Sequence, residues 1–235
     1  MERYRRQFRF LLGGLVVVLL TSFIVGTFIY MGQVGKRETA LKEAAKTVAP
    51  PDNPAIENTN PDAEHRYGDP NAKVIISVFG DYQCPYTIRG VDYLKTVVMQ
   101  YNSGVAFIYH HFPLESIHAN ARYAAQAAEA ASLQGKFWPM SSLIFAGQDV
   151  WSGQNHETLA TTFEGYAETL GLDINKYKQD IAAANVRTKI DKDISQARER
   201  GLNGTPSVFL NGEAVDLEIV YDSEAFNKLI GAKLE

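Results

Sequence analysis

The sequence predicts an α/β fold in which a block of helices is inserted into a small sheet. Three observations support this prediction: a β-α-β pattern at residues 73–109, amphipathic segments after Pro113, and a β-hairpin followed by a helix at residues 207–234. A chain of 235 residues with 46% hydrophobic residues can bury a core of its own. The net charge of −4 is not that of a dedicated nucleic-acid-binding protein, so no nucleic-acid partner is expected.

A transmembrane helix is predicted ahead of this fold. Residues 1–9 carry four arginines and one acidic residue, and an uncharged run of 22 residues follows at 10–31. As a helix this run would be about 33 Å long, against about 30 Å for the hydrocarbon core of a bilayer. It is longer than the apolar part of a cleaved signal peptide and lacks a clear cleavage site. We therefore predict a signal anchor at 10–31 rather than a buried core helix.

The distribution of basic residues predicts the orientation of this anchor. The arginines before the span place residues 1–9 in the cytoplasm as a basic tail. The protein is then a single-pass protein of the cell membrane, with the rest of the chain extracytoplasmic, on the periplasmic or outer-surface side. Residues 32–66 are rich in Pro, Ala and charged residues and are interpreted as a linker, either a tether that keeps the domain near the membrane or a stalk without a specific role.

The β-α-β unit begins at Lys73. Residues 73–79 form a short apolar run rich in β-branched residues, which is typical of a buried strand. Residues 85–100 have apolar residues at helical spacing, and residues 105–109 form a second strand candidate. Because such crossovers are right-handed, the two strands are predicted to be parallel neighbours.

The rest of the chain is mainly helical until the final hairpin. The predicted helices are Ala119–Gln134, Trp138–Ala146, Leu159–Leu170, Ile174–Ala184 and Thr188–Arg200. Strands at Ser207–Leu210 and Ala214–Leu217 are joined by an Asn-Gly turn, which strongly favours a hairpin. A last helix is predicted over Ser223–Leu234, with Ser223 as its N-cap.

Cys84, the single cysteine of the chain, is the main candidate for chemistry. It follows the first strand and directly precedes Pro85, a residue that fits the first turn of a helix because it has no N–H. Free N–H groups and the helix dipole at such a position stabilise a thiolate and increase its reactivity. One cysteine excludes a disulfide within the chain. A buried, inert cysteine is the alternative.

Four motifs occur in order within residues 67–235. They are Val74–Thr87, His111-Phe112-Pro113-Leu114, Gly135-Lys136-Phe137-Trp138 and Gly204-Thr205-Pro206-Ser207-Val208-Phe209-Leu210-Asn211-Gly212. Together they resemble the DsbA-type branch of the thioredoxin-fold proteins. The resemblance implies a thioredoxin fold over residues 67–235, with a helical domain inserted at about 114–200.

The resemblance also implies roles for individual residues. Cys84 would be the nucleophilic sulfur, and Pro85 and Tyr86 the dipeptide that tunes it. Thr205 and Pro206 would form a substrate-facing loop with a cis peptide bond, which is uncommon among X-Pro bonds. No cofactor and no metal ion is implied.

The sequence departs from this family at two positions. Thr87 stands where the second, resolving cysteine belongs, and Val78 stands where many relatives carry a buried glutamate. Without a partner thiol the domain cannot cycle as an internal disulfide. Thr87 would still offer its hydroxyl and backbone N–H toward the Cys84 thiolate.

The favoured hypothesis is a thiol-disulfide oxidoreductase or isomerase that acts through a mixed disulfide at Cys84. Its partners would be cysteine-containing extracytoplasmic proteins, together with a small-molecule thiol or a membrane redox partner. A redox-inactive peptide-binding or chaperone-like module on the same fold is the main alternative. A glutathione-dependent transferase is a weaker one.

Other residue groups have simpler interpretations. His110, His111 and His118 with Glu115 lack the spacing of metal ligands on one helical face, so packing or solvent exposure is favoured. The aromatic residues Phe137, Trp138, Phe145 and Trp151 are predicted to lie in the core rather than to bind a ligand. Nucleotide-binding and serine-hydrolase motifs are absent from the sequence.

Overall fold

The computed structural model of the chain describes residues 21, 25–28, 32, 65–101 and 103–235. The predicted tail at 1–9 and nearly all of the predicted span and linker lie outside the described residues. Among the described residues, no helix is both long and apolar enough to cross a membrane. The anchor and the linker therefore stay predictions. The sheet and the helices of the fold belong to the compact unit at Ala45–Glu235.

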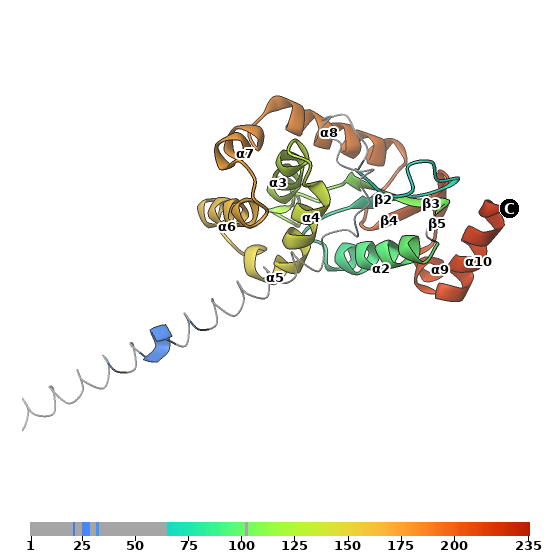
Figure 1. Ribbon diagram of the computed structural model, residues 1–235, viewed down its shortest axis with the longest axis horizontal. Coiled ribbons are helices and arrows are strands. Elements are labelled where there is room, and N and C mark those ends of the chain that lie inside the picture. Colours follow the sequence, from blue (N-terminus) through green and yellow to red (C-terminus); the bar gives the residue numbers. More distant parts are fainter. Residues whose placement is uncertain (1–20, 22–24, 29–31, 33–64, 102) are drawn as a thin grey trace, which may run out of the picture. The chain divides into compact units, whose positions relative to one another are not determined.

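A mixed sheet of five strands lies at the centre of the described part of this unit (Figure 1). The strands are β1 (His65–Gly68), β2 (Val74–Gly80), β3 (Val105–His111), β4 (Ser207–Leu210) and β5 (Glu213–Val215). Their order across the sheet is β1-β3-β2-β4-β5. β2 and β3 are parallel, which confirms the prediction for the β-α-β unit, whereas the other neighbouring strands are antiparallel.

The edge strand β1 differs from the sequence-based expectation. The pattern of residues assigns His65 and Arg66 to the linker, but both belong to a strand in which His65 lies opposite Tyr109 of β3. A four-residue strand that reads His-Arg-Tyr-Gly has no apolar alternation to reveal it. Its pairing with β3, rather than its own composition, makes it a strand.

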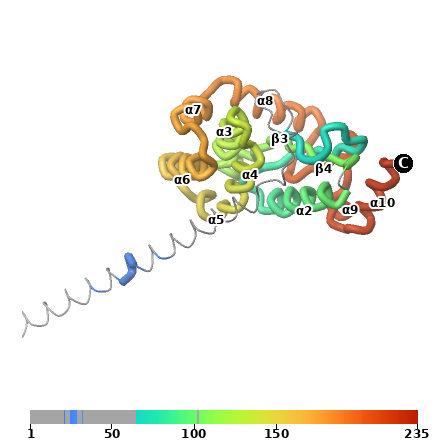
Figure 2. Tube along the Cα trace, viewed as in Figure 1, coloured from blue at the N-terminus to red at the C-terminus, as the bar shows by residue number. Residues whose placement is uncertain are grey.

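Nine helices lie within residues 65–101 and 103–235. They are α2 (Pro85–Tyr101), α3 (Ala121–Ser132), α4 (Phe137–Ala146), α5 (Gln148–Trp151), α6 (His156–Thr169), α7 (Ile174–Asp180), α8 (Ala184–Glu199), α9 (Leu217–Tyr221) and α10 (Ser223–Leu234). Helices α3 to α8 separate β3 from β4 in the chain, as an inserted helical block does. Figures 1 and 2 show α3, α4, α6 and α7 gathered at one end of the sheet.

Alternate side chains of β3 face different layers of the unit. The ring of Tyr109 lies near that of Phe137 on α4, whereas His110 faces Asp193 on α8. Helix α2 covers the Tyr109 side, because a Cβ added to Gly80 would lie 2.7 Å from the methyl carbon of Thr87 and 2.6 Å from the Tyr109 ring. The four aromatic residues assigned to the core are all buried, which confirms that prediction.

The final hairpin and helix differ from the sequence prediction in detail. Asn211 and Gly212 have φ angles of 49° and 85°, as an Asn-Gly hairpin turn requires. The second strand ends at Val215, and the short helix α9 follows where the strand was expected to continue. The N-cap of α10 is Asp222 rather than Ser223, because its carboxylate accepts hydrogen bonds from two N–H groups of the first turn.

Candidate active site

Cys84 lies in a short loop between β2 and the start of α2. Its residue is only 6% exposed. The thiol donates to the carbonyl oxygen of Thr205, with 3.2 Å between sulfur and oxygen. The backbone N–H of Cys84 donates to the carbonyl oxygen of Asp81 at 3.1 Å, and the backbone carbonyl of Cys84 accepts from the N–H of Thr87 at 3.1 Å. The sulfur is therefore held between the first turn of α2 and the loop before β4.

The loop before β4 has the geometry that the resemblance implied. The Thr205–Pro206 peptide bond is cis. Pro206 also lies against α2, since a Cβ added to Gly90 would be 3.5 Å from the Pro206 ring. The structure thus brings Cys84, Thr205 and Pro206 together, although 121 residues separate Cys84 from Thr205.

The three residues after Cys84 differ in exposure. Pro85 begins α2 and is exposed, and the side chain of Tyr86 points out of the core with its residue 63% exposed. The Tyr86 carbonyl oxygen accepts a hydrogen bond from the hydroxyl of Tyr221 at 3.4 Å. Thr87, in contrast, is fully buried.

The polar groups of Thr87 have partners other than the sulfur. Its N–H donates to the carbonyl oxygen of Cys84, and its hydroxyl oxygen accepts from the N–H of Asp81 at 3.3 Å. Thr87 was expected to offer both groups to the thiolate. In this arrangement only the hydroxyl hydrogen is still available as a donor.

Asp81 organises the loop that carries Cys84. Its buried carboxylate accepts three hydrogen bonds, from the N–H groups of Gln83 and Leu114 at 2.7 Å each and from Nδ1 of His118 at 2.8 Å. The contact with Gln83 spans two residues, as in an Asx turn. An aspartate that directly follows a strand is typical of such a turn, and this was the only sign in the sequence that Asp81 has a structural role. The other two partners lie beyond β3, so sequence reasoning missed this role.

Replacing Asp81 with Asn should destabilise the protein. The NH₂ group of the asparagine side chain would face one of the N–H groups that now donate to the carboxylate, so two hydrogen-bond donors would meet. The expected loss is about 1–3 kcal/mol of unfolding free energy. Urea unfolding of the purified protein at pH 7 measures it. Asp191→Asn is the matched control, since Asp191 is 60% exposed and its ion pair with Arg122 should contribute at most about 1 kcal/mol. Equal losses in the two variants would contradict this role of Asp81.

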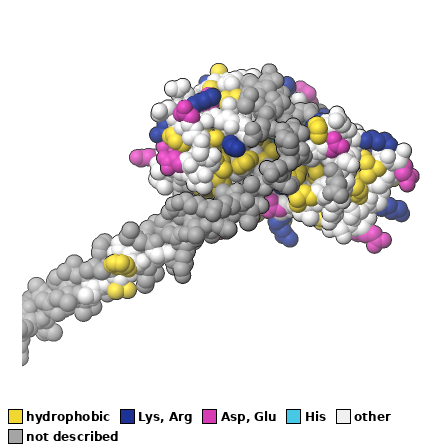
Figure 3. Space-filling model, viewed as in Figure 1, with side chains coloured by type: hydrophobic (Ala, Val, Ile, Leu, Met, Phe, Trp, Pro, Cys, Tyr) yellow, Lys and Arg dark blue, Asp and Glu magenta, His cyan; other side chains and the backbone are white. Residues whose placement is uncertain are grey.

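Apolar side chains reach the surface near the cysteine loop. Figure 3 shows hydrophobic side chains interspersed with charged ones on the face of the described unit that the view presents. Val150 on α5 and Ile219 and Tyr221 on α9 are among the exposed large hydrophobic residues, together with Tyr86. Such a surface can contact an unfolded or extended protein chain.

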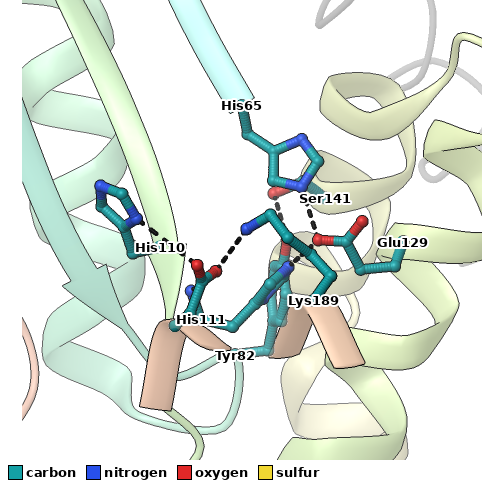
Figure 4. Close-up of polar contacts among 8 residues, drawn as sticks. His65, Tyr82, His110, His111, Glu129, Ser141 and Lys189 are labelled. Carbon is teal, nitrogen blue, oxygen red and sulfur yellow. Dashed lines mark hydrogen bonds and ion pairs between the residues drawn. The ribbon is translucent and has the colours of Figure 1, made fainter. Parts of the chain in front are cut away.

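The four metal-candidate residues from the sequence are not brought together. His118 pairs with Asp81, Glu115 pairs with Arg122, and His110 faces Asp193. His111 instead meets Glu129 of α3 and His65 of β1 in the buried cluster drawn in Figure 4. Sequence reasoning missed this cluster, whose members come from three separate elements.

The distances in this cluster are those of hydrogen bonds. Nε2 of His65 and Nε2 of His111 lie 2.5 and 2.7 Å from the same oxygen, Oε1 of Glu129. The three atoms that could serve as metal ligands, one from each residue, lie within 4.8 Å of one another. Ligands about 2.0–2.2 Å from a tetrahedral zinc ion would be about 3.3 Å apart. Among the described residues Nδ1 of His111 has no hydrogen-bond partner, whereas the second ring nitrogen of a metal-bound histidine usually has one.

Burial and hydrogen bonding determine the charge of this cluster. Burial lowers the pKa of His65, which favours its neutral form. Burial alone would raise the pKa of Glu129, but the interactions with the two imidazoles outweigh it and hold this pKa well below its ordinary value. The carboxylate is therefore an ionised acceptor in the interior, between β1, β3 and α3.

Curated relatives match a large part of this chain. A protein of Mycobacterium sp. strain KMS called Na(+)/H(+) antiporter NhaA 1 is 33% identical over 162 residues, which is 67% of this chain and 25% of that protein. The chain thus spans about a quarter of the length of the curated relatives it matches first. The antiporter name describes those longer proteins.

Solved structures show the same fold. Oxidised BdbD from Bacillus subtilis superposes with a TM-score of 0.62 at 18% identity, over 73% of this chain and 92% of that one. DsbA2 from Pseudomonas aeruginosa superposes with a TM-score of 0.56 at 24% identity, over 72% of this chain and 94% of that one. The family model described as thioredoxin matches residues 60–232, and the chain therefore belongs to the thioredoxin family.

Proposed function

We propose that this protein is a monothiol exchange enzyme that acts on disulfides of extracytoplasmic proteins. The observation that carries the proposal is the placement of Cys84 at the start of α2, facing the Thr205–Pro206 loop, with Thr87 in the first turn instead of a second thiol. The similarity to DsbA2 and BdbD structures supports thiol-disulfide chemistry on this fold.

The first step of the proposed reaction is attack by the Cys84 thiolate on a substrate disulfide. The substrate S–S bond breaks, a bond forms between Cys84 and one substrate sulfur, and the other leaves as a thiolate. In the second step a thiolate of the substrate, or of a small molecule, attacks the mixed disulfide and releases Cys84. Attack by a substrate thiolate isomerises the disulfide without net oxidation, whereas attack by two small thiols in succession reduces it.

The position in the cell is part of the proposal. The basic tail at 1–9 and the apolar run at 10–31 support a single-pass anchor with the catalytic domain outside the cytoplasm. Cysteine-containing proteins that fold there would be the substrates. A small-molecule thiol or a membrane redox protein would restore the free thiol.

Mixed-disulfide formation tests the proposal. Incubation with oxidised glutathione should attach one glutathionyl group per chain and release one molecule of glutathione, because the chain has a single cysteine. Mass spectrometry measures the adduct. The purified protein should also speed recovery of activity by a scrambled disulfide protein in a glutathione buffer. Cys84→Ser should abolish both effects.

The alternative is a peptide-binding module without redox activity. The exposed side chains of Tyr86, Ile219 and Tyr221 favour it, since such a surface needs no reactive sulfur. It predicts that wild type and Cys84→Ser slow the aggregation of an unfolded protein equally and that neither reactivates scrambled substrate. That result, with no glutathione adduct on the wild type, would overturn the enzyme proposal.

A further inference from the structure

Two Asn-Gly pairs occur in the chain, Asn203-Gly204 and Asn211-Gly212. Asparagine followed by glycine is prone to spontaneous loss of its side-chain amide, because glycine has no side chain to hinder attack by its backbone nitrogen. The attack requires that the side-chain carbonyl carbon of the asparagine can approach this nitrogen. Whether either pair reacts therefore depends on how the fold holds the asparagine.

Asn211 is held by hydrogen bonds at its side chain and at its backbone. Its Oδ1 accepts from the backbone N–H of Ile75 at 2.7 Å, and its Nδ2 donates to the carbonyl oxygen of Lys73 at 3.3 Å. Its backbone N–H donates to the carbonyl oxygen of Ile75 at 2.8 Å. The side chain of Asn211 must leave both of its partners before its carbonyl carbon can meet the nitrogen of Gly212.

Asn203 lies in the segment between α8 and β4, outside any helix or strand, and is exposed. Among the described residues its side-chain amide has no hydrogen-bond partner, and the N–H of Gly204 donates to no acceptor. A Cβ added to Gly204 would meet no atom within 4 Å apart from its chain neighbours. The attacking nitrogen and the carbon that it attacks are therefore both free to move toward each other.

We propose that Asn203 is a site of spontaneous deamidation. The nitrogen of Gly204 loses its proton and forms a bond to the side-chain carbonyl carbon of Asn203. The bond from this carbon to the amide nitrogen breaks, so that ammonia leaves and a succinimide ring remains. Water then opens the ring at either of its carbonyl groups. The products are aspartate and isoaspartate, and no atom is oxidised or reduced.

The modification changes the loop that faces Cys84. Thr205, two residues after Asn203, accepts the hydrogen bond of the Cys84 thiol, with 3.2 Å between sulfur and oxygen. The hydroxyl of Ser207 donates to the carbonyl oxygen of Gly204 at 2.9 Å, which ties this loop to the start of β4. Either product adds a negative charge to the loop, and isoaspartate also lengthens the backbone by one atom.

Peptide mapping of the full-length protein after incubation at pH 8 tests the proposal. Trypsin releases both asparagines in one peptide, residues 201–228, so fragmentation in a mass spectrometer compares them in the same molecule. Asn203 should deamidate about 30-fold faster than Asn211, a difference of about 2 kcal/mol in activation free energy. This difference corresponds to breaking the two side-chain hydrogen bonds of Asn211. A sample digested without incubation supplies the background.

Unfolding supplies the control for the effect of the fold. In protein unfolded in urea at the same pH the two asparagines should deamidate at equal rates, because both are followed by glycine and neither is held. Equal rates in the folded protein, or a faster reaction at Asn211, would overturn the inference. An increase on unfolding that is as large for Asn203 as for Asn211 would also overturn it, since the fold would then protect both.

Gly204→Ala tests the identity of the attacking nitrogen. Open space around Gly204 accepts the methyl group, so the variant should fold like the wild type. The methyl group hinders the approach of the nitrogen at position 204, so deamidation of Asn203 should slow several-fold while that of Asn211 stays unchanged. An unchanged rate at Asn203 would contradict the proposed step.

Deamidation needs no thiol, so this inference and the proposed function fail separately. Cys84→Ser should deamidate at Asn203 at the wild-type rate. Deamidation at Asn203 together with no glutathione adduct on the wild type would overturn the enzyme proposal alone. A normal adduct on a protein in which Asn203 stays intact would overturn this inference alone.

Discussion

Replacing Thr87 with cysteine is expected to convert a monothiol protein into one that cycles between a dithiol and an internal disulfide. Residues one helical turn apart have Cα atoms about 5 Å apart, within the range of about 4.4–6.8 Å that a disulfide allows. Thr87 is buried in the first turn after Cys84, and cysteine is similar in size. The hydrogen bond from Asp81 would be lost, at a cost of about 1 kcal/mol.

The stoichiometry of the reaction with oxidised glutathione distinguishes the wild type from the Thr87→Cys variant. The wild type should keep one glutathionyl group and release one glutathione. The Thr87→Cys variant should release two and keep none, because the second thiol displaces the bound group. Mass spectrometry and a thiol assay measure both quantities.

Thr96→Cys is the matched control for this variant. Thr96 is exposed on the same helix, 12 residues from Cys84, which corresponds to about 18 Å along the helix axis. This control should hold two separate glutathionyl groups and form no internal disulfide. A persistent mixed disulfide in Thr87→Cys would contradict the placement of Thr87 beside the sulfur.

Replacing Glu129 with alanine is expected to cause the largest loss of stability among the variants considered. The substitution removes the acceptor shared by His65 and His111, leaves two buried imidazole N–H groups without it, and opens space in the core. Breaking a buried network in this way costs about 3–5 kcal/mol. Urea unfolding at pH 7 measures the loss.

Glu164→Ala is the control for the loss of a helical glutamate. Glu164 pairs with Lys178, whose side chain is 51% exposed, so this variant should lose at most about 1 kcal/mol. A loss below about 1 kcal/mol in Glu129→Ala would show that the buried cluster does not stabilise the sheet.

The buried cluster also predicts how the stability of the wild-type protein depends on pH. The folded-state pKa of Glu129 lies below its ordinary value of 4.5, and that of His65 below 6.5. The unfolded chain therefore takes up protons that the folded chain does not as the pH falls below about 6.5. The stabilisation is complete above this pH and is lost on acidification. The unfolding free energy of the wild type should accordingly be smaller at pH 4 than at pH 7, as urea unfolding at the two pH values measures.

The sequence by itself predicted the parts of the fold that depend on local pattern. The β-branched run before Cys84, the helix that begins with Pro85 and the Asn-Gly hairpin are each determined by neighbouring residues. Apolar periodicity and turn chemistry act over a few residues, so a single sequence contains enough information to locate them. The short strand β1 has no such pattern and was missed.

The resemblance, rather than any local pattern, predicted that the Thr205–Pro206 loop faces Cys84. A sequence pattern alone does not indicate a contact across 121 residues. The resemblance predicted this contact because the chain keeps the family's motif at each end of it, Cys84-Pro85 at one and Thr205-Pro206 at the other, even though Thr87 replaces the second cysteine.

Only the tertiary structure decided which polar groups meet in the interior. The His65–Glu129 contact spans 64 residues, and the Asp81–His118 contact spans 37. Each arises because strands and helices that were separately predictable pack in one arrangement and exclude water from the groups between them. A buried polar group must then pair with whichever partner the packing brings near, and no local pattern identifies that partner. The sequence by itself thus predicted that Cys84 lies at the start of a helix, and the packing determined which polar groups surround the cysteine loop.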